Sequence, residues 1–154
     1  MATTMIDHLK ALHTSAIDAR NGYREALRDT EGKETESKAM TALFRDMIAL
    51  HESHADELAR ELTRRNELAD DEGSFMTMVH KTIMDVHSMF DGLDESVLPG
   101  LIDGEKRNVG KYDAALEAQE PVTNVASVLI RQRDSLARKI ILMEMERAAS
   151  EHVS

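Results

Sequence analysis

The sequence predicts an all-α fold, a four-helix bundle of two antiparallel helical hairpins with an additional helix in the crossover between them. Aromatic residues are only 3 % of the 154-residue chain, which disfavours strands. Long segments instead repeat apolar residues at spacings of three and four, as amphipathic helices do. The length suits one domain with its own hydrophobic core, so we expect a single domain over residues 1–154.

The first hairpin is predicted from two long helices, at about residues 4–29 and 34–66, joined by a short turn around Gly32. Thr3 or Thr4 can cap the first helix. The inward positions of the first helix are Ile6, Leu9, His13, Ala16, Arg20, Tyr23 and Leu27. Those of the second are Met40, Phe44, Met47, His51, His54, Leu58 and Leu62. Because the connection is short, the two helices should run antiparallel.

A shorter helix is predicted in the crossover, at about residues 74–91, with Ser74 as its cap. Its apolar residues are spread around most of its circumference, so contact with the bundle alone cannot bury them all. We therefore expect a homodimer formed through this helix, since a symmetric dimer is the commonest way to cover such a patch. The contacts would be made by Phe75, Met76, Val79, Ile83, Met84 and Met89.

The second hairpin is predicted at about residues 97–119 and 122–149, with Pro99 in the first turn of one helix and a tight break at Glu120 and Pro121. The inward positions of its first helix are Leu98, Ile102, Glu105, Val109, Tyr112 and Leu116. Those of its second helix are Val125, Leu129, Gln132, Leu136, Ile140 and Met143.

Composition narrows the function classes. The chain has no cysteine, which removes disulfides, thiolate metal sites and cysteine nucleophiles and fits a reducing compartment. Its net charge of −10 disfavours binding to nucleic acid and to anionic membrane surfaces. The segment after Met1 is charged and amphipathic, and no apolar run is long enough to span a bilayer, so we expect a cytoplasmic protein.

Short motifs give the chain a family resemblance. They are Asp18 with Gly22-Tyr23-Arg24-Glu25-Ala26, Ala55 with Glu57-Leu58, Gly104-Glu105 placed seven residues before Tyr112, and Arg131-Gln132. With these motifs the chain resembles a bacterial family of small ferritin-like four-helix-bundle proteins of unknown function. The resemblance implies a ferritin-like bundle and no activity. The chain departs from the family at Lys139-Ile140, where such proteins often carry a histidine in the last helix.

The inward positions lack most ligands of a di-iron centre. Such a centre needs a carboxylate from each of two helices and a Glu-x-x-His pair from each of the others. Here the seam supplies Glu105, His51, His54 and Gln132. The first helix has Arg20 where an acid is needed.

Two interpretations of these inward polar residues follow. A buried guanidinium repels a cation and requires an anionic partner, so the first predicts an interior polar network that includes an Arg20–Glu105 ion pair. Its members are Arg20, Tyr23, Glu105, Tyr112 and Gln132. The alternative is a single-metal site of His51, His54 and Glu105, holding iron or another divalent ion.

The sequence thus favours a non-enzymatic ferritin-like bundle without a cofactor, acting as a structural, stress-associated or interaction module. The alternative function is a metal-dependent oxidase or iron-handling protein with a depleted site. No glycine-rich phosphate loop or nucleophile motif adds a third class. The sequence names neither a substrate nor a protein partner.

Overall fold

The computed structural model describes residues 4–30, 38–67, 95–118 and 123–153. Within them lie four α-helices: α1 (Met5–Thr30), α2 (Lys38–Arg64), α4 (Leu98–Glu117) and α5 (Thr123–Val153). A 3-10 turn at Glu95–Val97 leads into α4. The all-α class is confirmed. The predicted crossover helix at 74–91, with its dimer contacts, lies outside the described residues and stays a prediction.

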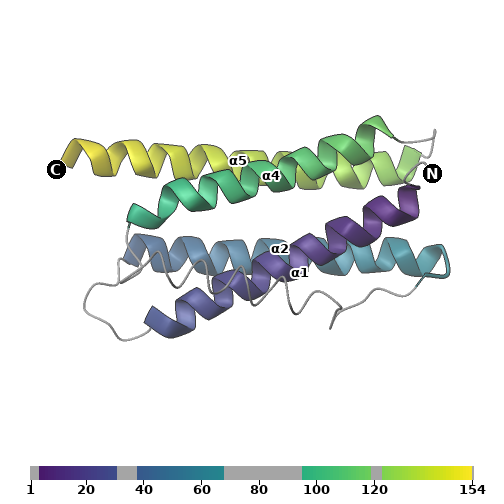
Figure 1. The fold of residues 1–154 in the computed structure, drawn as a ribbon, viewed down its shortest axis with the longest axis horizontal. Helices are drawn as coiled ribbons and strands as arrows, with labels where there is room; N and C mark the ends of the chain where they lie inside the picture. The colour runs from purple at the N-terminus through teal and green to yellow at the C-terminus, as the bar shows by residue number, and fades with distance from the viewer. Residues whose placement is uncertain (1–3, 31–37, 68–94, 119–122, 154) are drawn as a thin grey trace.

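The helices form two antiparallel pairs that lie along one another (Figure 1). α1 packs against α2, α4 packs against α5, and α1 also contacts α4. The colours of Figure 1 show that α2 and α4 run in the same direction. The last residue of α2 and the first residue of α4 therefore lie at opposite ends of the bundle. The last turns of α5 extend past the first turn of α4 (Figure 1).

The helix ends follow local chemistry. Thr4 caps α1, because its hydroxyl accepts from Asp7 N while Asp7 Oδ2 accepts from Thr4 N, both at 3.1 Å. These bonds lower the pKa of Asp7, with the backbone bond from Thr4 as the largest cause. α2 ends in a Schellman motif, in which Asn66 takes a φ of 59° and Glu67 N donates to Leu62 O at 2.9 Å. Asparagine tolerates this left-handed conformation, which explains why α2 stops there.

The core is formed by the inward seams of all four helices. Its completely buried apolar side chains include Leu9, Phe44, Met47, Leu58, Leu98, Leu129, Leu136 and Met143. Polar groups are buried among them at the middle of the bundle, including His13, His51, His54, Glu105 and Gln132. None of the described helices is long and apolar enough to cross a membrane.

Candidate functional site

A buried hydrogen-bonded triad, Tyr23 of α1, His51 of α2 and Glu105 of α4, joins three helices. Tyr23 Oη donates to Glu105 Oε1 at 3.1 Å, and His51 Nε2 lies 3.0 Å from the same oxygen. A carboxylate only accepts, so His51 carries its proton on Nε2 when it makes this contact. The exposed fractions are 6 %, 2 % and 3 %, so water competes little for these bonds. We call these three residues the central triad.

Aromatic packing fixes the triad's position. The Tyr23 ring stacks on His51 at 5.9 Å and meets Phe44 edge to face at 5.1 Å. Burial, the charge of Glu105 and the hydrogen bond to it raise the pKa of Tyr23 well above its ordinary value. Tyr23 is therefore a permanent hydrogen-bond donor, held to one carboxylate oxygen.

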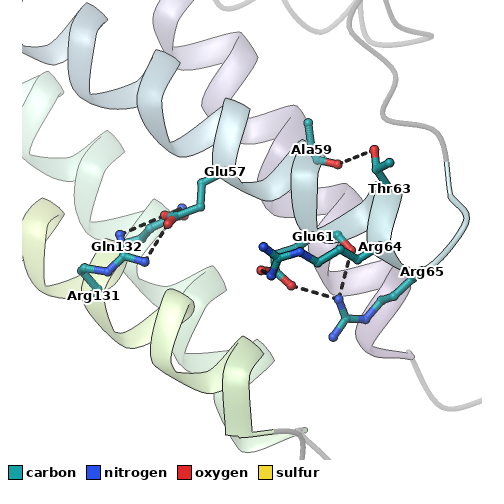
Figure 2. Close-up of polar contacts among 8 residues, drawn as sticks. All are labelled: Glu57, Ala59, Glu61, Thr63, Arg64, Arg65, Arg131 and Gln132. Atoms are coloured by element: carbon teal, nitrogen blue, oxygen red, sulfur yellow. Dashed lines mark hydrogen bonds and ion pairs between the residues drawn. The ribbon is translucent and has the colours of Figure 1, made fainter.

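A second network joins α2, α4 and α5. Gln132 is completely buried; its Oε1 accepts from Tyr112 Oη at 2.6 Å and its Nε2 donates to Glu57 Oε1 at 2.7 Å. Arg131 pairs with both Glu57 oxygens, at 3.1 and 2.6 Å. Figure 2 shows Glu57 reaching from α2 to the two neighbouring α5 side chains. We call Glu57, Tyr112, Arg131 and Gln132 the α2–α5 clamp.

The electrostatics of the clamp fix its protonation. Burial raises the pKa of Glu57, but the bonds from Arg131 and Gln132 more than offset burial, and the pKa lies below its ordinary value. Burial also raises the pKa of Tyr112, as do the charges of Glu105 and Glu57. Glu57 is thus an anion that accepts and Tyr112 a neutral phenol that donates.

His54 lies between the triad and the clamp. Its ring is 6.4 Å from His51 and perpendicular to it, and its Nδ1 is buried with no hydrogen-bond partner among the described residues. Burial, with a smaller effect of His51, lowers the pKa of His54 from 6.5 to about 4, although the charges of Glu57 and Glu105 act to raise it. Glu105 Oε2 is the second buried atom without a partner in the described chain.

Arg20 does not pair with Glu105. Its guanidinium bonds Asn21 Oδ1 at 3.2 and 3.1 Å and lies 3.9 Å from Glu52 Oε1. The long arginine side chain reaches toward Glu52, which is 44 % exposed, and the Arg20 side chain itself is 19 % exposed, so both groups keep some contact with water. The uncharged hydroxyl of Tyr23 bonds Glu105 instead. Glu105 therefore lacks the expected guanidinium partner.

The structure thus brings together two pairs from the predicted polar network, Tyr23 with Glu105 and Tyr112 with Gln132. It places two of the three predicted metal ligands, His51 and Glu105, 3.0 Å apart and bonded to each other. In the described segments, no three His, Asp or Glu side chains converge as ligands of one ion. The metal set stays a prediction.

Two features were not expected from the sequence. Glu57 and Arg131 stand in the motifs that carry the family resemblance, but they become partners only because the fold brings α5 beside α2 at this level. Glu61 is 5 % exposed at the end of α2 and is bonded by Arg64 at 2.9 Å and Arg65 at 3.1 Å (Figure 2). Arginines three and four residues further along a helix lie beside the glutamate, which explains how this carboxylate is buried.

A shallow hollow of about 590 Å³ lies apart from the central triad, on the outer face of α5. It is lined by Ala126, Ser127, Ile130, Arg131, Asp134 and Arg138.

Comparison with known proteins gives one family. Residues 4–118 match the Domain of unknown function (DUF2383). No curated protein matches the chain, and no solved structure does. The matched residues contain α1, α2 and α4, and with them the whole central triad.

Proposed function

The chain belongs to the DUF2383 family, a domain of unknown function, and we propose that it is a non-enzymatic ferritin-like bundle that acts as a structural and interaction module. The observation that carries the proposal is Glu105 Oε1, which is engaged by both Tyr23 and His51 inside the bundle. This is the one inward acid of the predicted seam, and its bonds tie three helices together. In this proposal, the buried polar groups hold the helices together.

The helix arrangement supports the ferritin-like part of the proposal. Two antiparallel pairs in which α2 and α4 run in the same direction are what a single long crossover produces (Figure 1). The family resemblance of the motifs agrees with this layout. Fold similarity alone gives no activity, so the side chains decide the proposed role.

The clamp supports the structural role from a second place. The position on α5 that faces the bundle interior holds Gln132, an amide, whose two ends are taken by Tyr112 and Glu57. Such a group specifies how α5 sits against α2 and α4, because any shift would leave buried polar atoms unpaired.

One observation favours the alternative, a metal-handling protein. Glu105 Oε2 and His54 Nδ1 are buried ligand-type atoms without partners in the described chain. Together with His51 they are the atoms that a divalent ion would use, and imidazole with carboxylate suits iron, manganese or zinc. To bind such an ion through Nε2, His51 would have to give up its hydrogen bond to Glu105 Oε1, because the nitrogen that donates in that bond cannot also be a ligand.

Elemental analysis of freshly purified, untagged protein separates the two functions. We would compare wild type with the double variant His51→Ala, Glu105→Ala, and use Tyr23→Phe as the matched control, because it loses a triad bond but keeps every candidate ligand. We expect iron, manganese and zinc far below one ion per chain in all three, before and after incubation with one equivalent of Fe²⁺. Near-stoichiometric metal in wild type and Tyr23→Phe that is lost from the double variant would overturn the proposal.

A further inference from the structure

α5 differs from an ordinary bundle helix because apolar residues lie on its outer face as well as its inner one. Leu129, Leu136 and Met143 point into the core and are at most 1 % exposed. Four large apolar side chains on the same helix are exposed in the described structure, namely Ile130 42 %, Ile141 55 %, Leu142 52 % and Met145 62 %. A helix apolar on two sides is normally covered on both.

Arg138, Leu142 and Glu146 follow one another at four-residue spacing and so share one side of α5, which we call the Leu142 face. The two charges on this face have opposite sign, and within the described residues neither has an ion-pair partner. In the part of the chain that the structure describes, Arg138 donates to the neutral hydroxyl of Ser135 at 3.2 Å. By contrast, Arg131, Arg133, Lys139, Glu144 and Arg147 all form ion pairs within the chain.

We propose that a second copy of this chain docks antiparallel on the Leu142 face, with the two-fold axis passing between the two Leu142 side chains. Arg138 precedes Leu142 by four residues and Glu146 follows it by four, about 6 Å along the helix on either side. An antiparallel second copy then sets Arg138 of each chain beside Glu146 of the other. The same patch faces itself, as an isologous two-fold interface requires.

The shape of α5 fits this occupant. In such a pair, residues before Leu142 on one copy lie level with residues after it on the other. The part of the hollow nearest Leu142, at Asp134 and Arg138, therefore receives the turn of the other helix that begins at Glu146. The last turns of α5 extend past the first turn of α4 (Figure 1), so α4 does not cover them. Ala148 and Ala149 on them are exposed and small enough to allow close approach.

This inference deepens the proposed interaction role by naming the partner as the protein itself. The two can fail separately: bound metal would overturn the non-enzymatic function, whereas a monomer would overturn only the docking on α5.

Charge reversal tests the pairing. Sedimentation of the full chain over micromolar concentrations should show a dimer for wild type. Arg138→Glu and Glu146→Arg should each raise the dimer dissociation constant about tenfold or more, because each creates two like-charge contacts. The double variant Arg138→Glu, Glu146→Arg should restore dimerisation. The matched control Arg107→Glu, an exposed arginine on α4, should leave the dimer unchanged. A monomeric wild type, or a double variant as weak as the singles, would overturn the proposal.

A single engineered thiol tests the axis. The chain has no cysteine, so Leu142→Cys introduces the only one. Across a two-fold axis the two thiols come within disulfide reach, and mild oxidation should give a covalent dimer. The matched control is Gly110→Cys, at an exposed position on α4 where an added Cβ would meet no heavy atom within 4 Å. On a denaturing gel without reducing agent, this control should run as a monomer and Leu142→Cys as a covalent dimer. A Leu142→Cys variant that neither crosslinks nor reacts with maleimide would mean that another part of the chain covers this face, which overturns the proposal.

Discussion

Among single residues, His54 should make the fold sensitive to acid. Its pKa in the folded chain is about 4 against an ordinary value of 6.5, so between these pH values the unfolded chain binds more protons than the folded one. The stability that depends on neutral His54 is therefore fully present above about pH 6.5, and it is lost as the pH falls toward 4. Between pH 7 and 5 we expect the free energy of unfolding to decrease by about 2 kcal/mol through this group.

Urea unfolding of wild type and His54→Leu at the two pH values measures this effect. Leucine fills a similar volume and has no titrating group, so the variant should lose most of the difference. An equal loss of stability in both proteins would show that His54 is not the group responsible.

A second pair of single residues, Tyr23 and Glu105, should be energetically coupled. Tyr23→Phe removes a buried donor without a large change in shape, and we expect a loss of about 1–2 kcal/mol of unfolding free energy. Glu105→Gln weakens the same bond and also changes the contact with His51. A double-mutant cycle of the two should give a coupling energy of about 1 kcal/mol. Additive effects in urea unfolding would mean that the 3.1 Å contact adds nothing to stability.

The sequence predicted which polar residues are buried but not which of them bond to each other. The seam spacing placed Tyr23, His51, Glu105, Tyr112 and Gln132 inward, and all five are buried. The spacing could not identify their hydrogen-bond partners, because a rotation or shift of one helix by a fraction of a turn brings different side chains together. Arg20 shows the limit: its Cα falls on the predicted seam, but a side chain of its length reaches the rim and pairs there.

At the element scale, the clamp should hold α5 through Gln132 far more than through Arg131. Arg131 is 57 % exposed, so Arg131→Ala should cost below about 1 kcal/mol despite the 2.6 Å contact. Gln132→Ala opens a cavity in a completely buried site and leaves Tyr112 without its acceptor, which should cost about 3 kcal/mol. Comparable losses in urea unfolding would contradict this assignment of roles.

The helices themselves were the easier part of the prediction. Expected bounds of 4–29, 34–66, 97–119 and 122–149 compare with Met5–Thr30, Lys38–Arg64, Leu98–Glu117 and Thr123–Val153 in the structure. The end of α2 depends on a left-handed Asn66, and the end of α5 has no strong stop residue in the sequence. The inward positions predicted for α5 are all buried, but the exposed apolar residues on its outer face were not predicted, because the periodic pattern identifies only the side that packs in the core.

At the scale of the whole molecule, α5 completes a core that the other helices cannot close. The family match covers residues 4–118 and so contains α1, α2 and α4, while α5 begins at Thr123. Yet α5 supplies Leu129, Leu136 and Met143 to the core and the buried amide to the clamp. Without it, the side of α4 that packs against α5 would face water, and Tyr112 would lose its acceptor.

A fragment of residues 1–118 should therefore be helical but lack cooperative unfolding. Burial of apolar side chains dominates stability, and removing one of four helices should cost more than the net free energy of unfolding of a small bundle, which is only about 5–15 kcal/mol. Far-ultraviolet circular dichroism with urea would show a broad, shallow transition for the fragment and a sharp one for the full chain. Adding residues 119–154 as a separate peptide should restore the sharp transition, and the same peptide carrying Gln132→Ala should do so less well. A fragment that unfolds cooperatively alone would show that the family-matched helices bury a sufficient core among themselves.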